Sequence, residues 1–395
     1  MSRLPLAALA GLFLVSLALR PQLLAIGPLL PLIRADLGLS AAVAGLLGTI
    51  PVLCMGLFAP AGPRLVARIG PRLAMAVCLS ALGVFGLLRA LAPNVPLILA
   101  ATFGLGLALG TTGAIPAIIV KLRAPGVPAL GTGAYAGGIV AGSALAAAVA
   151  VPLAGASGDW RWSLGVLAVA GLVPVVAWLA FVAPDRPEVS GADPAPALPW
   201  RSGTAWLLVA IFGLQSLLYY ALVAWMPNAY VERGWDELSA GSLVAIINAV
   251  GLTTTLGVPM IADRLGSRRG QLIVSSVAAL GGVLGVVLVP ELGFIWAAAL
   301  GLALGAIFPL VLTLPVDVAD APGDVGATAA LMLAGGYVLS ATGPVVLGLA
   351  RDATGDFAAS LWILVALGIV LVGTCLLLSP RRLSRGIRRE VARAA

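Results

Sequence analysis

Hydrophobic residues fill this chain in long runs rather than in the short alternating patterns that soluble folds use. Each run holds about 20 residues, the length that an α-helix needs to cross a lipid bilayer. A bilayer core offers no water to unpaired backbone groups, so such runs are expected to be helical. The pattern therefore predicts an all-α membrane protein with 12 transmembrane helices. The predicted spans cover residues 5–31, 40–62, 73–91, 96–120, 127–151, 162–183, 204–228, 239–261, 271–289, 293–316, 325–350 and 357–379.

The second half of the chain repeats motifs of the first half in the same order. Residues 31–38 match 227–234 and residues 68–72 match 264–268, both at an offset of 196, and residues 158–160 match 355–357 at an offset of 197. Two copies of six spans insert with the same orientation, an arrangement typical of transporters whose substrate binds near the bilayer midplane. We therefore predict two pseudo-symmetric six-helix bundles. The predicted parts are an N-terminal bundle 1–183, a cytoplasmic linker 184–203, a C-terminal bundle 204–380 and a basic cytoplasmic tail 381–395.

Charge changes this picture by giving the bundles an orientation. Only 10% of the residues are charged and 61% are hydrophobic, whereas soluble domains carry about a quarter charged residues. Of the 23 Lys and Arg residues, 17 fall in segments on the same side as the termini and four in the opposite loops. Basic loops stay inside, so both termini are predicted to be cytoplasmic. Because these residues cluster between spans, the net charge of +7 does not indicate nucleic-acid binding.

Several kinds of chemistry are missing from the sequence. It contains no histidine, which excludes His-based acid–base catalysis, metal sites and proton relays. Its three cysteines all lie in apolar spans, and no phosphate-binding glycine loop is present. We expect neither an enzyme nor a cofactor. The 16 acidic residues fall in loops or at span ends, which leaves three modes open: proton coupling through the substrate or an end-of-helix carboxylate, facilitated diffusion, and exchange.

Arg20 is the most informative residue of the first span because it lies near its middle, next to Pro21. A guanidinium at that depth costs roughly 2.5–3.5 kcal/mol on insertion scales, so it is expected to face a polar cavity or an internal partner. One interpretation makes Arg20 an anion-attracting group in a permeation path. The other makes it a structural arginine, bonded to carbonyls that Pro21 frees or to a neighbouring helix.

The loop Asp263-Arg-Leu-Gly-Ser-Arg-Arg269 resembles the D-R-x-G-x-R-R signature that the major facilitator superfamily carries between spans 8 and 9. Its copy between spans 2 and 3 lacks the acidic residue, so an Asp-based latch is not expected there. The resemblance implies the major facilitator fold, with gating loops that change conformation during transport. The residues that it assigns to these loops are Arg68, Gly70, Arg72, Asp263, Arg264, Gly266 and Arg268.

A narrower resemblance covers essentially the whole chain. It rests on Leu19-Arg-Pro21, the segments 27–31 and 36–40, the run 212–220 with 224–227, and Gly336-Tyr337 with Gly343-Pro344. These motifs are similar to those of the cyanate and 2-nitroimidazole permease family (CynX/NimT). Membership of that family implies transport of small anions or small polar nitrogen compounds.

By superfamily analogy, spans 1, 4, 7 and 10 line a central cavity, with contributions from spans 2, 5, 8 and 11. Gln215 and Tyr219 lie four residues apart and therefore on one helical face. Tyr and Gln in membrane helices also hydrogen-bond neighbouring helices, and Thr bonds its own preceding turn. Both roles stay open for each candidate. The predicted substrate-binding residues are Arg20, Thr112, Tyr135, Gln215, Ser216, Tyr219, Asn248 and Tyr337.

These observations favour a secondary transporter that works by rocker-switch alternating access. Arg20 would hold a small anion or a nitro group, because its planar fork binds two oxygens at once. The alternative is an exporter of small drug-like compounds in which Arg20 is structural. We expect a monomer in the inner membrane, partnered by lipid and a small substrate and not by nucleic acid.

Overall fold

The computed structural model describes residues 6–39, 41–183, 197–265 and 268–379, and all of its regular elements are helical. The chain divides into two compact units. Unit 1 comprises Met1–Val127, Ala134–Leu198 and Ala321–Ala330; unit 2 comprises Pro128–Gly133, Pro199–Asp320 and Leu331–Ala395. The predicted domain boundaries stay predictions. The linker residues 184–196 and the tail 381–395 lie outside the described residues.

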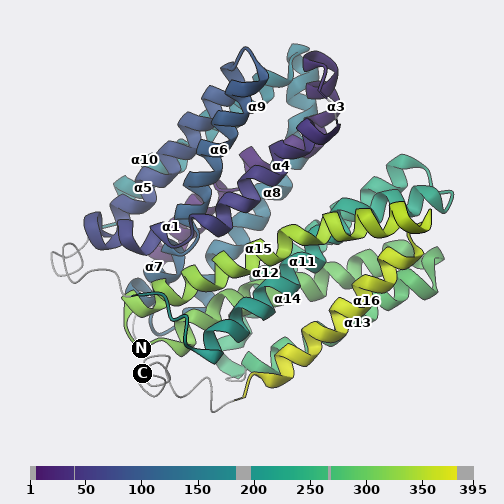
Figure 1. Cartoon of the computed structure of the whole chain (residues 1–395). Helices are drawn as coiled ribbons and strands as arrows, with labels where there is room; N and C mark the ends of the chain where they lie inside the picture. The colour runs from purple at the N-terminus through teal and green to yellow at the C-terminus, as the bar shows by residue number, and fades with distance from the viewer. Residues whose placement is uncertain (1–5, 40, 184–196, 266–267, 380–395) are drawn as a thin grey trace. The chain divides into compact units, whose positions relative to one another are not determined.

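In the first half of the chain, the described residues form ten helices that account for the first six predicted spans (Figure 1). Within unit 1, α5 packs against α6 and α9, and α4 packs against α6. The helices are α1 (Leu6–Leu17), α2 (Pro21–Leu24), α3 (Ile26–Leu37), α4 (Ala41–Leu57), α5 (Ala61–Leu91), α6 (Val95–Thr112), α7 (Ile115–Arg123), α8 (Pro128–Ser157), α9 (Trp160–Ala170) and α10 (Val173–Phe181).

Where the structure describes the second half, it forms six α-helices and one 3₁₀ turn that account for the other six spans. Within unit 2, α14 packs against α12 and α13, and α16 packs against α11 and α13 (Figure 1). The elements are α11 (Gly203–Glu232), α12 (Glu237–Leu265), α13 (Arg268–Leu288), η2 (Pro290–Leu292), α14 (Gly293–Val318), α15 (Pro322–Thr354) and α16 (Ala358–Leu377).

Eleven helical segments of the described residues are long and apolar enough to cross a membrane. The segment Leu46–Leu57 of α4, within the second predicted span, is a shorter apolar helix. The all-helical membrane fold predicted from hydropathy is therefore confirmed. Three predicted spans are interrupted, and the first of them contains two breaks, one of which lies at Ala25 between α2 and α3. At the other three breaks a proline is the first or second residue of the helix that follows: Pro21 in α2, Pro116 in α7 and Pro174 in α10. Proline lacks an N–H and disfavours a helical residue before it, which explains these breaks.

One predicted connection is more helical than the sequence pattern indicated. The polar segment between the second and third spans is not an open loop, because α5 already begins at Ala61. Helical geometry is interrupted only at Gly70, whose φ of 78° and ψ of 158° lie in a region that glycine alone adopts readily.

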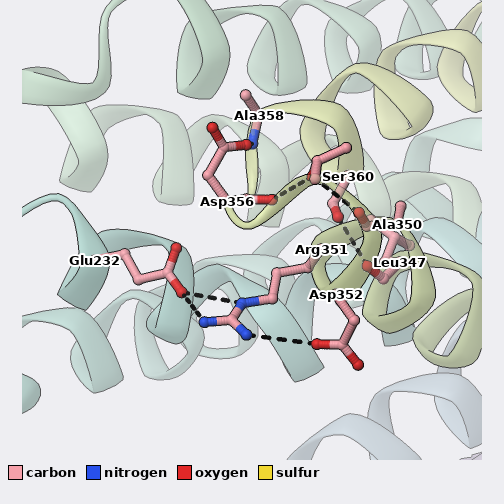
Figure 2. Close-up of polar contacts among 9 residues, drawn as sticks. Glu232, Leu347, Ala350, Arg351, Asp352, Asp356, Ala358 and Ser360 are labelled. Atoms are coloured by element: carbon pink, nitrogen blue, oxygen red, sulfur yellow. Dashed lines mark hydrogen bonds and ion pairs between the residues drawn. The ribbon is translucent and has the colours of Figure 1, made fainter.

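The internal repeat is visible in the local geometry of both units. Gly38 and Gly234 take left-handed φ angles of 62° and 91°, and they occupy equivalent positions in the two halves. Side chains repeat as well: Ser163 Oγ donates to the carbonyl of Ala150 at 2.8 Å in unit 1. In unit 2 the equivalent Ser360 Oγ donates to the carbonyl of Leu347, also at 2.8 Å (Figure 2). The same hydrogen bond at equivalent positions indicates that the two halves share one local structure, as the sequence repeat predicts.

Small residues bring helices close together, as membrane packing requires. In α8, a Cβ atom built on Gly138 would overlap the carbonyl oxygen of Phe13, and one built on Gly142 would overlap that of Leu17. In unit 2, a Cβ on Gly301 would lie 2.6 Å from the carbonyl oxygen of Ile247. Glycine at these positions lets two helix backbones touch.

Candidate functional site

Arg20 lies at the first helix break of unit 1. The residues between α1 and α2 form a turn in which Leu19 N–H donates to the carbonyl of Ser16 at 3.1 Å. Arg20 is the residue before Pro21 and has φ −104° and ψ −23°. Its side chain is only 7% exposed. The sequence thus places a buried guanidinium beside a stretch of backbone that is not fully helical, and such stretches in membrane proteins occur where they are buried in protein or line a cavity.

Two of the predicted residues of unit 2 are in direct contact. Tyr219 on α11 donates its hydroxyl proton to Asn248 Oδ1 on α12 at 2.7 Å. Asn248 Nδ2 in turn donates to the carbonyl of Val244 at 2.9 Å, which fixes the amide orientation. The Tyr219 ring also meets the Tyr220 ring edge to face, with centroids 5.4 Å apart.

The remaining predicted residues of unit 2 pack closely along α11. Gln215 and Ser216 are both buried, and Ser216 Oγ lies 3.4 Å from Gln215 Oε1. Tyr337 on α15 packs edge to face on Phe212, with ring centroids 5.1 Å apart. The Tyr337 ring therefore helps to join α15 to α11.

The predicted residues of unit 1 besides Arg20 are Thr112 and Tyr135, and both are buried. Thr112 Oγ1 donates to the carbonyl of Ala108 at 2.7 Å, one turn back in α6. Thr111 does the same toward Leu107 at 2.8 Å. This backbone bonding is the alternative that the sequence left open for both threonines, and it occupies their hydroxyl protons.

The acidic loop signature forms a compact ionic cluster within unit 2. Asp263 Oδ1 pairs with Arg268 Nη2 at 2.5 Å, and Arg268 Nε pairs with Asp317 Oδ2 at 3.0 Å. The Asp263 carboxylate also accepts the backbone N–H groups of Ala129 and Leu130 at 3.2 Å each. These are orphan donors in the first turn of α8, and a negative charge there also complements the helix dipole. Arg264 ends α12, and Gly266 lies outside the described residues.

The equivalent segment of unit 1 has a different partner. Arg72 donates through Nε to the carbonyl of Val182 at 2.7 Å and through Nη2 to that of Leu179, both at the C-terminal end of α10. Cations complement a helix C-terminus. Arg68 lies one turn before Arg72 on the other side of the Gly70 kink. Arg72 thus binds two backbone carbonyls at the end of α10.

Unit 1 also contains an ion pair between Asp36, near the end of α3, and Arg161, at the start of α9. Arg161 Nη1 lies 2.5 Å from Asp36 Oδ2, and Trp160 Nε1 donates to the same oxygen at 3.1 Å. The hydrogen bond from Arg161, followed by that from Trp160, lowers the pKa of the Asp36 carboxyl below its ordinary value. The pair is 26% and 47% exposed, so solvent screens it.

The structure also shows a hollow of about 570 Å³ along one face of α3. None of the predicted substrate-binding residues lines it. The one cation in its lining is Arg34, which the charge count placed among the four basic residues of the loops opposite the termini. The lining residues are Gly27, Leu30, Arg34, Ala35, Gly38 and Leu39.

Arg89 is the functional candidate that sequence reasoning missed. It is 0% exposed in α5 and donates through Nη2 to both oxygens of Gln22. The available signal was the charge itself, because a cation inside a transmembrane segment is a functional hypothesis by default. The described residues contain no group of three or more His, Cys, Asp or Glu that would hold a metal ion.

Apolar spanning helices, an internal repeat and buried cations inside the spans define a multi-pass membrane protein of the transporter class. The sequence profile of the Major Facilitator Superfamily matches residues 8–344. The chain belongs to this superfamily, as the loop signature predicted.

Two relatives from Escherichia coli (strain K12) match nearly the whole chain. The cyanate transport protein CynX is 32% identical over 91% of this chain and 93% of its own length. The 2-nitroimidazole transporter is 28% identical over 93% of this chain and 94% of its own. The predicted resemblance to this pair is therefore confirmed. Family and fold identify the protein as a secondary transporter.

Solved structures agree on the fold. The proton:xylose symporter XylE superimposes with a TM-score of 0.79 at 14% identity, covering 99% of this chain and 98% of that structure. The human organic anion transporter MFSD10 gives a TM-score of 0.71 at 18% identity, with 94% and 99% covered. At these identities the likeness concerns the fold alone.

Proposed function

We propose that this protein moves a small anion or a small polar nitrogen compound across the inner membrane by rocker-switch alternating access. The observation that carries the proposal is Arg20, a buried cation at a proline break of the first span. Relatives that transport cyanate and 2-nitroimidazole support the substrate class. Both termini are proposed to be cytoplasmic, and the protein to act as a monomer.

Arginine suits this task because its guanidinium keeps its charge and presents donors in a planar fork. Two parallel N–H···O bonds hold the two oxygens of a nitrate or nitro group, and a single strong bond holds an end of cyanate. Arg20 therefore attracts and orients the negative end of the substrate. Tyr219 and Asn248, which already share a hydrogen bond, are proposed to contact the rest of the substrate together with Gln215, Ser216, Tyr135, Tyr337 and Thr112.

The ionic cluster around Asp263 is proposed to be part of the gating machinery. Its carboxylate binds two orphan N–H groups and one guanidinium at once. Each of these bonds involves a charge, and such bonds contribute about 1.5–3 kcal/mol. A contact of this strength stabilises one conformation while still breaking within a transport cycle.

A binding panel with the purified full-length protein tests the proposal. Cyanate, nitrate, 2-nitroimidazole and a larger neutral drug-like compound are each added during thermal unfolding. A ligand at 100 times its Kd stabilises the folded protein by about 2.7 kcal/mol. We expect stabilisation by at least one of the three small compounds, its loss in Arg20→Ala, and its partial retention in Arg20→Lys.

The same variants are then assayed for uptake in proteoliposomes. The Arg20→Ala protein should insert in the membrane at normal levels and transport nothing. Wild-type uptake by Arg20→Ala would rule out the anion site. Stabilisation only by the larger neutral compound, unaffected by Arg20→Ala, would instead establish the drug-exporter function.

A further inference from the structure

Unit 1 contains a second intramembrane cation whose surroundings differ from those of a substrate group. Arg89 lies in the last turn of α5 and is completely buried. Burying a guanidinium in a membrane protein is costly, so such residues have a specific partner. The partner here is Gln22, which follows Arg20 and Pro21 in the sequence.

Gln22 is held by three hydrogen bonds from two helices that are distant in sequence. Arg89 Nη2 donates to the Gln22 main-chain carbonyl and, at 2.7 Å, to its side-chain Oε1. On the other side of the amide, Gln22 Nε2 donates to the carbonyl of Leu164 on α9 at 2.9 Å. The donor and acceptor ends of the amide are both used, so its orientation is fixed. Among the described residues, Nε and Nη1 of Arg89 have no acceptor, which leaves Gln22 as the protein's acceptor for this cation.

Helix α5 is shaped to receive this amide. Gly86 lies one turn before Arg89 and therefore on the same helix face. A Cβ atom on Gly86 would stand 2.8 Å from Gln22 Cδ and 2.9 Å from Oε1, and 3.1 Å from the Cβ of Ala168. The missing side chain makes room for the Gln22 amide between α5 and α9. Helix α5 therefore provides both the space that the Gln22 side chain occupies, at Gly86, and the cation that donates to it, Arg89.

The backbone around Gln22 needs such support. Helix α2 has four residues and is preceded by the turn that contains Arg20. A helix leaves its last four carbonyls without intrahelical donors, so α2 has little internal hydrogen bonding. Arg89 satisfies one of these carbonyls directly. Only one residue separates Gln22 from Arg20, and it is the conformationally fixed Pro21.

We infer that Arg89 is a positioning residue: acting through Gln22, it fixes α2 and thereby the direction in which Arg20 presents its guanidinium to the substrate. This role rests on the proposed function of Arg20 and adds a second arginine to it. Groups that orient the ligands of a metal site contribute about 10–100-fold to metal affinity or activity, and a group that orients Arg20 is expected to act on the same scale. We therefore expect loss of the Arg89–Gln22 contact to weaken anion binding about tenfold or more.

The test uses two substitutions that both disturb the Gln22 amide, one by changing its hydrogen-bond donor and the other by filling the space that it occupies. Arg89→Lys keeps the charge but replaces the rigid, planar guanidinium, whose Nη2 reaches both oxygens of Gln22, with an ammonium on a flexible and shorter side chain. Gly86→Ala keeps both polar partners and only displaces the Gln22 side chain. The matched control is Gly165→Ala on α9, where the nearest atom to a new Cβ is the Ala90 Cβ at 3.9 Å.

Purified full-length variants are titrated with cyanate and nitrate, and the Kd is measured beside the melting temperature without ligand. We expect Arg89→Lys and Gly86→Ala to raise the Kd about tenfold, while Gly165→Ala binds as wild type. In an Arg20→Lys background, where Arg20 no longer forms a fork, the further effect of Arg89→Lys on Kd should shrink. A purely structural arginine would lower the melting temperature and leave the Kd unchanged.

The outcomes separate the two proposals. Loss of binding in Arg20→Ala with wild-type Kd in both Arg89→Lys and Gly86→Ala overturns the positioning role and leaves the anion site intact. Wild-type Kd in Arg20→Ala overturns the anion site and the positioning role together. Weaker binding in all three variants supports both.

Discussion

The contact between α8 and α1 gives the sharpest stability prediction. Pro21 has no N–H, so the carbonyl of Leu17, four residues earlier, has no helical donor. Gly142 lies against this carbonyl: an added Cβ would overlap its oxygen and stand 2.9 Å from its carbon and 3.1 Å from the Leu17 Cα. All three atoms belong to the backbone and cannot rotate away. Gly142→Ala therefore forces α8 and α1 apart at the residue where α1 ends.

The magnitude follows from two opposing effects. Overpacking a tight contact costs about 1–3 kcal/mol, and backbone contacts lie at the upper end because no rotamer change relieves them. Alanine is a better helix former than glycine by about 1 kcal/mol. Gly155→Ala in the same helix gains the helix propensity of alanine without any overpacking, because nothing lies within 4 Å of its Cβ position. The Gly142→Ala protein should be less stable than the Gly155→Ala protein by about 1–3 kcal/mol.

Equilibrium unfolding in mixed micelles, followed by tryptophan fluorescence, measures this difference. Wild type, Gly142→Ala and Gly155→Ala are compared at one detergent composition. Because Leu17 lies three residues before Arg20, nitrate binding is measured on the same samples, and Gly142→Ala should also weaken it. Equal stability of the two alanine variants would refute the close approach of α8 to α1.

Two ionic contacts give further predictions. Asp263→Asn should destabilise the protein by about 2 kcal/mol, because it removes the charge that faces both Arg268 and the first turn of α8; in thermal unfolding the exposed Asp320→Asn serves as control, and equal midpoints would contradict the assignment. Arg161 holds the pKa of Asp36 below its unfolded value, so this contact stabilises the folded state above the ordinary Asp pKa of about 3.9 and is lost as the pH falls through the folded pKa. The melting-temperature advantage of wild type over Asp36→Asn should thus be present at neutral pH and vanish on acidification, and an advantage that persists at low pH would show that the ion pair is not its source.

Sequence alone determined which segments cross the membrane and that the chain is duplicated. Bilayer thickness and the demand for internal backbone bonding act on each span separately, so hydropathy and length suffice. The repeat predicted equivalent positions, and Gly38 and Gly234 indeed share left-handed φ angles. The spans were expected to be continuous, yet three of them are broken, and a proline begins or nearly begins the next helix at three of the breaks.

The side-chain partners were decided by tertiary structure. Thr112 was a candidate for the site, yet its hydroxyl bonds its own helix, and which of its two possible roles applied was not readable from sequence. Tyr219 and Asn248, placed in the same predicted site, meet directly. The roles of the predicted substrate-binding residues remain predictions that the Arg20 experiments test.

Arg89 shows most clearly why the sequence reveals the spans but not the contacts between their side chains. The charge was visible in the sequence, but its partner Gln22 lies 67 residues away along the chain, and Leu164, which accepts from Gln22, lies 142 residues from Gln22. Only helix packing brings these residues together. In a soluble helix the polar face reveals which side is buried. In a membrane span both the lipid-facing side and the protein-facing side are apolar, so hydropathy fixes where a helix runs and leaves its rotation undetermined. Helix rotation decides which side chains meet, and only the packed structure specifies it.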